Sequence, residues 1–462
     1  MTVYTLFGYI GIAALILTVL RIMLKTTNNW LVTYLQNFVG ALFVFSGFVK
    51  AVDPMGTGFK MEEYFESMHL EVFNPLSLGM SVAMLVAELT LGVALLIGWK
   101  PRLTTILMLL LNVFFLLLTG YTYLSGFSPT NLFFVFALAT AGVWCASAIV
   151  EKKGLRYGLM GAGAFMLLVL LATVKYSNLF FTESFDATKM KVTDCGCFGD
   201  FIKLKPWQTF YKDVVLTAMI FIVTIYYKSI RPLLNGLSRM AITAATGLVS
   251  LWFCCYNFLW NEPVIDFRPY AIGNDLNEMR REIKPQKVDF VFVYKNKKTG
   301  ASKEFKTAEL GNLTEDWEYV SRKDIVLEEG IPARISNLFI FNENKEDITE
   351  DLLHDDNYTL VVFAYKLDKT HACCFRNHLN EIAAKAKAKG ITMYGLSNDD
   401  ATPFKQKEGV SFPFYTADAT PLKTAMRSNP GLMLLKNGVV VNKWHHRHLP
   451  TFEWLDQHYF SK

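Results

Sequence analysis

The stretch LSLGMSVAMLVAELTLGVALLIG, residues 76–98, decides the fold class of this 462-residue chain. A helix needs about 20 apolar residues to cross the hydrocarbon core of a bilayer, and this stretch meets that length with Glu88 as its single ionisable residue. Comparable stretches recur before residue 260, so we predict an all-α bundle of about eight membrane-spanning helices. They cover roughly residues 4–24, 32–52, 76–98, 102–124, 131–150, 158–180, 213–230 and 238–260.

Composition separates the chain into two regions. Hydrophobic residues make up 52% of the sequence and aromatic residues 14%, too large a share for a soluble protein of this length. Nearly all of the excess lies before residue 260, whereas residues 261–462 have the mixed composition of a soluble domain. The net charge of +5 is spread along the chain without a basic, aromatic-rich patch. We therefore expect a lipid bilayer as the partner and no nucleic acid.

Basic residues gather in alternate loops and predict the orientation. The loops after the first, third, fifth and seventh predicted spans hold nearly all the unbalanced positive charge, so we expect them in the cytoplasm. The N-terminus and the soluble region would then face the periplasm of a bacterial inner membrane. The first span has its basic residues behind it, which favours a retained anchor over a signal peptide. The loop cations are Arg21, Lys25, Lys100, Arg102, Lys152, Lys153, Arg156, Lys228, Arg231 and Arg239.

Two cysteines, Cys195 and Cys197, stand one residue apart in the turn-forming run Asp194-Cys-Gly-Cys-Phe-Gly-Asp200. A disulfide between them would close a small, strained ring, and strained disulfides are the labile ones. Gly196 removes the Cβ that would obstruct such a ring, and Gly199 lets the chain turn away. One hypothesis is a redox-active pair at the membrane surface. The alternative is a turn whose cysteines only pack.

Three polar residues of the predicted spans form a candidate intramembrane site. Glu88 lies near the middle of its span, where an ionised carboxylate is costly, so we expect it to be protonated or hydrogen-bonded to a polar neighbour. Asn112, near the midpoint of the next span, is the predicted neighbour. Lys50 lies within a turn of the outer surface, and we expect its side chain to reach the interface. A proton relay, a quinone or substrate site, and interhelical hydrogen bonding are the alternatives for Glu88.

These motifs resemble the DoxX/MauE superfamily, most closely its Bacteroidetes branch, in which the membrane unit is fused to an outward C-terminal domain. The resemblance rests on Phe45-Ser-Gly-Phe-Val-Lys-Ala-Val-Asp-Pro54, the span containing Glu88, and Asp194–Asp200 followed by Pro206-Trp207. It implies a helical bundle linked to quinol chemistry or to disulfide maturation, a redox or assembly role for the two cysteines, and a polar site at the glutamate. The spans at 131–180 are an insertion relative to this branch.

The soluble region divides in two. Residues 261–332 contain a linker and alternating runs such as Val288–Tyr294, which predict a β-rich connector. Residues 333–462 resemble a thioredoxin-like domain of the TlpA type. A continuous apolar strand at Thr359–Tyr365 precedes a helix, a second strand and a hairpin, which predicts an α/β sandwich. Pro430, before the hairpin, resembles the cis-proline of that fold.

Cysteine content sets this domain apart from active thioredoxin-like enzymes. The Cys-x-x-Cys pair should fall where this chain has Thr370-His-Ala-Cys-Cys374, so ordinary dithiol exchange is not expected there. Cys373 and Cys374 are candidate secondary thiols: a strained vicinal disulfide, one reactive thiol near a helix start, or relics in a binding domain. On a strand His446 and His448 would share a face, which suits a metal, but the ligands are too few and we predict no metal site.

Two main functional hypotheses follow. The first is a thiol–disulfide or quinone-linked redox factor acting on periplasmic proteins, with Cys195 and Cys197 as the catalytic pair and a quinone as the candidate cofactor. The second is a non-catalytic scaffold or assembly factor whose thioredoxin-like domain binds a periplasmic or membrane protein. A transporter built around Glu88 is disfavoured because the spans hold few polar groups and no inverted repeat.

Overall fold

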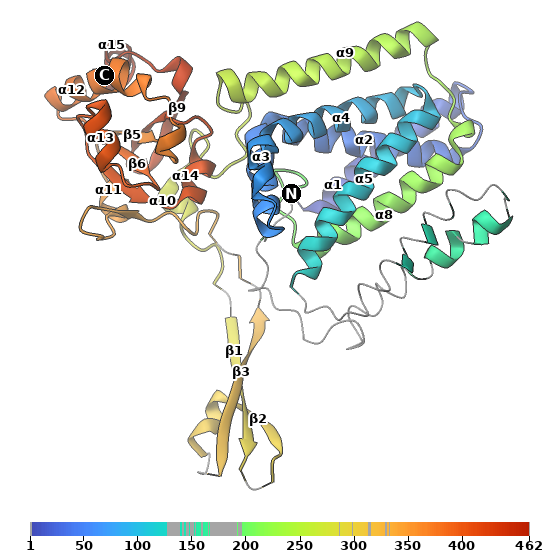
Figure 1. Ribbon diagram of the computed structural model, residues 1–462, viewed down its shortest axis with the longest axis horizontal. Helices are drawn as coiled ribbons and strands as arrows, with labels where there is room; N and C mark the ends of the chain where they lie inside the picture. The colour runs from blue at the N-terminus through green and yellow to red at the C-terminus, as the bar shows by residue number, and fades with distance from the viewer. Residues whose placement is uncertain are drawn as a thin grey trace. The chain divides into compact units, whose positions relative to one another are not determined.

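A computed structural model describes most of the chain and divides it into two compact units, Met1–Asn257 and Phe258–Lys462 (Figure 1). The predicted spans at 131–150 and 158–180 lie largely outside the described residues, as does Cys195. The described residues are 2–126, 139–140, 143–144, 147, 152, 154–158, 160–164, 166, 192, 196–285, 287–297, 299–312, 316–328, 330–331 and 333–461.

The first unit is a bundle of long helices. Within its described residues, six helical segments are long and apolar enough to cross a membrane, and they correspond to predicted spans one to four, seven and eight. The total of eight spans stays a prediction. The helices are α1 (Val3–Met23), α2 (Trp30–Val52), α3 (Pro54–Ser67), α4 (Ser77–Ile97), α5 (Pro101–Leu124), α8 (Pro206–Ile225) and α9 (Gly236–Cys255), with the 3-10 turn η1 (Glu71–Leu76) before α4.

The close packing of α2 against α4 depends on two glycines. A Cβ atom at Gly47 would lie 2.9 Å from the Leu89 side chain, and a Cβ atom at Gly92 would lie 2.9 Å from the Val44 side chain. Small residues are typical of contacts between membrane helices because they let two backbones approach. The approach positions the site, since Gly47 lies directly beside Glu88.

One end of the bundle collects the basic loops. The guanidinium of Arg21, near the end of α1, donates to the carbonyl oxygen of Leu96 near the end of α4. Arg239, near the start of α9, donates to the Gly98 carbonyl at 2.8 Å. The ends of α1 and α4 and the start of α9 therefore lie together. Which side of the membrane this end faces remains a prediction.

The short helix α3 follows α2 after a single residue. Asp53 separates the two helices, and its carboxylate accepts the backbone N–H of Gly56 at 3.0 Å. Pro54 begins the helix, where its missing N–H costs nothing because the first N–H groups of a helix have no internal partner. Met61 and Tyr64 are buried on one side of α3, and both line the cavity described below.

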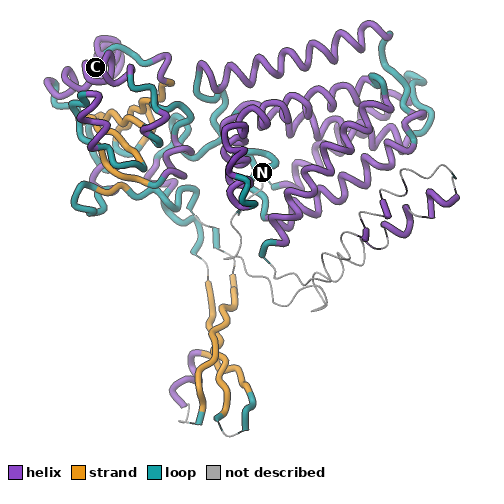
Figure 2. The backbone as a smooth tube through the Cα atoms, in the orientation of Figure 1, coloured by secondary structure: helices purple, strands orange, loops and turns teal. Residues whose placement is uncertain are grey.

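The second unit contains two β-sheets (Figure 2). A three-stranded antiparallel sheet has the order β2-β1-β3, and a six-stranded sheet has the order β4-β7-β6-β5-β8-β9. In the larger sheet β5, β6 and β7 are parallel, and β4, β8 and β9 are antiparallel to their neighbours. The strands are β1 (Lys287–Asn296), β2 (Ser302–Lys306), β3 (Trp317–Glu328), β4 (Ile340–Phe341), β5 (Tyr358–Phe363), β6 (Thr392–Ser397), β7 (Phe414–Ala417), β8 (Gly431–Lys436) and β9 (Val439–His445); the helices are α10 (Leu276–Met279), α11 (Thr349–Leu353), α12 (Asn380–Ala388), α13 (Thr402–Glu408), α14 (Ala419–Ala425) and α15 (Phe452–Leu455).

Strand β5 is buried on both faces, as its continuous apolar run predicts. Leu360 and Val362 pack into one hydrophobic cluster, while the alternating Val361 and Phe363 pack into another. The predicted order of strand, helix, strand and closing hairpin is present as β5, α12, β6 and the pair β8–β9. The sheet therefore separates two cores, each covered by other segments of the unit.

Strand β9 ends before the histidines that were expected on it. His446–His448 form a short 3-10 turn, so the prediction that His446 and His448 share a strand face is wrong. The backbone N–H of His446 donates to the hydroxyl of Ser428 at 2.8 Å, and this bond takes the place of a further ladder contact. The chain consequently leaves the sheet at this residue.

A buried network of ion pairs anchors the first residues of the second unit to its core. Arg268 pairs with Asp266 at 2.7 Å and with Glu262 at 3.1 Å, and Lys443 of β9 pairs with Asp266 at 2.9 Å. Burial alone would raise the pKa of both carboxyls, but the charges of Arg268 and Lys443 outweigh it and hold each pKa below its ordinary value. Burial lowers the pKa of Lys443 to about 8, with Arg268 adding to the effect.

The network predicts acid sensitivity of the second unit. A carboxyl whose folded pKa is depressed contributes stability above its ordinary pKa and loses it as the pH falls toward the folded value. Protection of β8 and β9 amides against hydrogen exchange in the intact protein should therefore fall as the pH drops below 4.5 and 3.8, the ordinary values for Glu262 and Asp266. Glu262→Gln should lower the free energy of unfolding at neutral pH by about 3–5 kcal/mol. It should also reduce the further loss of amide protection as the pH falls.

The control for this prediction is an exposed ion pair of the same unit. Glu381 pairs with Lys385 at 2.6 Å, and both side chains are exposed. Glu381→Gln should change stability by no more than about 1 kcal/mol. Equal effects of the two substitutions would contradict the importance of burial in the network.

Candidate functional site

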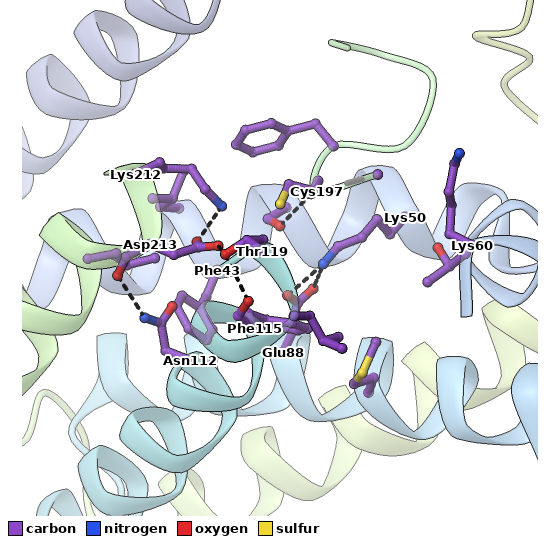
Figure 3. Close-up of a pocket in the computed structure, with 18 of the residues that line it drawn as sticks. Phe43, Lys50, Lys60, Glu88, Asn112, Phe115, Thr119, Cys197, Lys212 and Asp213 are labelled. Carbon is purple, nitrogen blue, oxygen red and sulfur yellow. Dashed lines mark hydrogen bonds and ion pairs between the residues drawn. The ribbon is translucent and has the colours of Figure 1, made fainter. Parts of the chain in front are cut away.

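A narrow cavity of about 60 Å³ lies inside the first unit (Figure 3). Side chains of α2, α3, α4, α5 and α8 form its walls, together with residues 196–198, which include the last two residues of the Cys-Gly-Cys motif. Its lining is unusual for the interior of a membrane bundle because charged side chains take part in it. The polar and charged residues at its walls are Ser46, Lys50, Thr57, Lys60, Tyr64, Glu88, Asn112, Thr119, Cys197, Lys212 and Asp213.

An ion pair between α2 and α4 forms one wall of the cavity. The Nζ atom of Lys50 lies 2.6 Å from each carboxylate oxygen of Glu88, and both side chains are almost fully buried. Lys50 also lies over the ring of Phe115, 5.0 Å from its centroid. The prediction that Lys50 reaches the interface is therefore wrong. Its side chain turns inward because Glu88 offers a charge partner where an unpaired cation would be costly.

A second pair, Lys212–Asp213 of α8, lies on the other side of the cavity. The two side chains are 2.7 Å apart, and Asp213 also accepts a hydrogen bond from the Thr119 hydroxyl of α5 at 3.0 Å. Sequence reasoning missed this pair because it started the seventh span at 213. The available signal was Pro206, since proline is frequent at the first position of a helix and would have moved the helix start ahead of both residues.

Asn112 bonds to α8 and not to Glu88, contrary to the prediction. Its Nδ2 atom donates to the Thr217 hydroxyl at 2.7 Å and to the Asp213 carbonyl at 3.3 Å. Glu88 has a stronger partner in Lys50, so the amide is free to join α5 to α8. Among the described residues, the buried Oδ1 atom of Asn112 has no hydrogen-bond donor. The cavity thus offers one unsatisfied acceptor beside its two ion pairs.

The Cys-Gly-Cys turn lies against the cavity through Cys197. The hydroxyl of Ser46 donates to the Cys197 carbonyl at 3.1 Å, and the neighbouring Phe198 is buried. Gly196 and Gly199 have φ values of 59° and 52°, a left-handed conformation that glycine adopts without strain. The Cys197 side chain is partly buried.

Lys212 connects this thiol to the charges of the cavity. Its ammonium interacts electrostatically with the Cys197 sulfur while it pairs with Asp213. It also lies over the ring of Phe198, 5.5 Å from the centroid. The arrangement can stabilise a thiolate, because a neighbouring cation favours the charged form of cysteine.

The candidate quinone does not fit this cavity. Pockets that bind organic ligands have volumes of about 300–1,000 Å³, several times larger than the cavity. We therefore derive no chemical step that passes through a quinone.

The candidate thiols of the second unit lie beside the Pro430 loop. The peptide bond between Asn429 and Pro430 is cis, the geometry that the sequence analysis expected there. Cys373 and Cys374 are free thiols, and Cys374 approaches the carbonyl of His446 at 3.9 Å. Burial, assisted by Cys373, raises the pKa of Cys374 to about 11. Its thiol is thus held in the protonated form, which does not suit it to nucleophilic exchange.

Two stacked histidines accompany these thiols. The rings of His371 and His446 lie 4.2 Å apart, and burial is the main cause that lowers the pKa of His446 to about 3. Its Nδ1 atom lies 2.9 Å from the hydroxyl of Ser428. In the part of the chain that the structure describes, no group of three or more metal-ligating side chains is gathered.

The buried Lys50–Glu88 pair yields a stability prediction. Glu88→Gln leaves Lys50 without its charge partner and should lower the free energy of unfolding by about 3–5 kcal/mol. Lys50→Met combined with Glu88→Met removes both charges and should restore most of that loss. Thermal unfolding of the purified protein in nanodiscs measures both effects.

The matched control is the Lys60–Glu63 pair of α3, 2.7 Å apart and partly exposed. Glu63→Gln should change stability by no more than about 1 kcal/mol. A Glu88→Gln protein as stable as this control would show that the buried pair does not hold α2 to α4.

Comparison with known proteins gives one family match. No curated protein and no solved structure matches the chain. The matched segment contains Lys50, Glu88 and Asn112 and ends before Cys197 and Lys212. Residues 28–130 match the family described as methylamine utilisation protein MauE, a family of membrane proteins.

Proposed function

We propose that the first unit is a membrane thiol–disulfide exchange factor in which Cys195 and Cys197 are the exchanging pair. The observation that carries the proposal is that Lys212 and Cys197 line the same buried, charged cavity and interact electrostatically there. A turn that only packed its cysteines would have no need of an ammonium group beside the sulfur. The MauE match over 28–130 supports a membrane unit of this type.

Several cavity residues would prepare the Cys197 thiol for exchange, each in a different way. Lys212 would favour the thiolate of Cys197, which is the nucleophile in disulfide exchange. Asp213, held by Thr119, would keep the ammonium in position. Ser46 would fix the turn through the Cys197 carbonyl. Lys50 and Glu88 would hold α2 and α4 together beneath the turn.

The exchange itself needs no further reagent. The Cys197 thiolate attacks one sulfur of a partner disulfide, forming a mixed disulfide and releasing the other partner sulfur as a thiolate that takes up a proton. Cys195 then loses its proton and attacks the Cys197 sulfur, forming the Cys195–Cys197 bond and releasing the second partner thiolate. Two electrons pass to the partner disulfide, and the reverse sequence oxidises a partner dithiol.

The alternating basic loops support an orientation for this chemistry. With those loops in the cytoplasm, the turn and the second unit would face the periplasm of a bacterial inner membrane, where disulfides persist. The order of strands in the larger sheet and the cis peptide bond at Pro430 favour a thioredoxin-like second unit. Such a unit would bind the protein whose disulfide is exchanged.

Trapping of a mixed disulfide tests the proposal. In Cys195→Ser protein, Cys197 can attack a partner but no second thiol resolves the product, so a reducible adduct should accumulate on non-reducing gels. Cys195→Ser combined with Cys197→Ser should remove it. The wild-type pair should cycle at a potential above about −300 mV, the range of labile disulfides, in differential alkylation of native membranes.

The control is Cys254→Ser, which removes a buried thiol of α9 and should leave the adduct unchanged in a Cys195→Ser background. Absence of any adduct through Cys197, with the protein present at normal abundance, would contradict the exchange mechanism. A Cys195–Cys197 pair that stays reduced at every redox potential tested would also contradict the exchange mechanism.

A second candidate function, binding without catalysis, is favoured for the second unit alone. The raised pKa of Cys374 argues against a reactive thiol there. Cys373→Ser combined with Cys374→Ser should therefore leave co-purifying proteins unchanged, whereas removal of 333–462 should release them. Mass spectrometry of the purified complexes measures both. Loss of partners in the double cysteine variant would contradict this role.

A further inference from the structure

A basic groove lies at the end of the bundle that carries the basic loops. Its walls come from the start of α5 and from the loop that follows α8. Its position along the helices is set by the membrane spans, since α5 begins at Pro101 and α8 ends at Ile225. The groove thus lies where these helices leave the hydrocarbon core. Its residues are Lys100, Pro101, Arg102, Leu103, Ile106, Tyr227, Lys228 and Ile230.

Three cations of the groove have no carboxylate partner among the residues that the structure describes. Lys100, Arg102 and Lys228 are exposed, and none forms an ion pair with a described residue. The sequence around them, at 97–105 and 226–239, contains no aspartate or glutamate. The described part of the chain therefore leaves the positive charge of the groove available to an anionic ligand.

The groove also has an apolar side. Leu103 and Ile106 lie on α5 with exposed side chains, about one and two turns further into the span than Lys100. Ile230 is buried behind Lys228. A charged rim followed by exposed aliphatic side chains along a membrane helix matches a molecule with an anionic head and a hydrocarbon tail.

We propose that this groove binds the phosphate headgroup of an anionic phospholipid. Lys100, Arg102 and Lys228 would contact the phosphate, and the lipid's first methylene groups would lie over Leu103 and Ile106. Basic pockets beside membrane helices bind anionic headgroups through this combination of charge and apolar contact. A free phosphate has no hydrocarbon tail, so it would not cover the exposed side chains of Leu103 and Ile106. The site is independent of the thiol chemistry proposed above.

Each cation near an anionic membrane surface strengthens binding by roughly fivefold. Neutralising two of them should therefore weaken lipid binding by roughly 25-fold, provided the lipid contacts both. The substitutions Lys100→Gln and Lys228→Gln remove charge from both walls of the groove and leave a neutral polar side chain at each position. They lie outside the cavity that holds Cys197.

The experiment measures phosphatidylglycerol retained by the intact protein. Purified wild-type protein, the Lys100→Gln/Lys228→Gln protein and a Lys25→Gln/Arg231→Gln control are titrated with phosphatidylglycerol or phosphatidylcholine and examined by native mass spectrometry. Lys25 and Arg231 are exposed cations of the same basic loops that do not line the groove. Thermal unfolding of each protein checks that the fold is retained.

The expected result is selective binding of phosphatidylglycerol that falls roughly 25-fold in the groove variant and much less in the control. Equal losses of phosphatidylglycerol binding in both variants would overturn the proposal, because they would indicate that binding depends on the general charge of the surface and not on the groove. Equal binding of phosphatidylcholine would also overturn it. Displacement by millimolar inorganic phosphate would identify an anion site without a role for the lipid tail and would contradict the lipid assignment.

Discussion

The burial of two lysine–carboxylate pairs within an apolar helical bundle is the constraint on which the rest of the first unit depends. Removing a charge from water is costly, and attraction to a partner repays the cost only when the two groups meet at close range. The Lys50–Glu88 pair therefore fixes α2 against α4, and the glycine contacts between these helices allow the approach. Lys212–Asp213 does the same between α8 and α5 through the Thr119 hydroxyl. The charges thus specify which helices meet and at what depth.

The buried Lys212–Asp213 pair also determines the electrostatic environment of the Cys197 thiol. An isolated cysteine at a membrane surface would have no reason to be ionised, whereas Cys197 lies beside an ammonium that is itself held by a buried carboxylate. The second unit has the opposite setting, because burial keeps the Cys374 thiol protonated. In the proposed function the two units differ for a physical reason: the first surrounds its sulfur with charge, and the second partly buries the Cys374 sulfur. Binding in the second unit and exchange in the first would then be complementary.

Much of this architecture follows from the sequence, but the site does not. Apolar length predicted the spans that the structure describes, and the continuous apolar run at Thr359–Tyr365 predicted the burial of β5 on both faces. The partners of Glu88 were mispredicted although the ends of α2, α4 and α5 lie within two residues of the predicted spans, because depth along a helix does not specify the face on which a side chain lies. Lys50 was expected at the interface because it lies near the end of its span, and Lys212 was overlooked because its helix begins at Pro206. Charge pairing between helices distant in sequence cannot be read from either helix alone.

The rate at which Cys197 reacts with iodoacetamide, measured across pH in a Cys195→Ser background, tests the central claim most directly. Because only the thiolate reacts, the rate reports the ionised fraction of this sulfur once the Cys197→Ser background is subtracted. The account predicts that Lys212→Met moves the half-maximal rate to higher pH and that Lys212→Arg, which keeps the charge, moves it back. Profiles that coincide in the wild-type, methionine and arginine proteins would contradict the proposed link between the buried charges and the thiol.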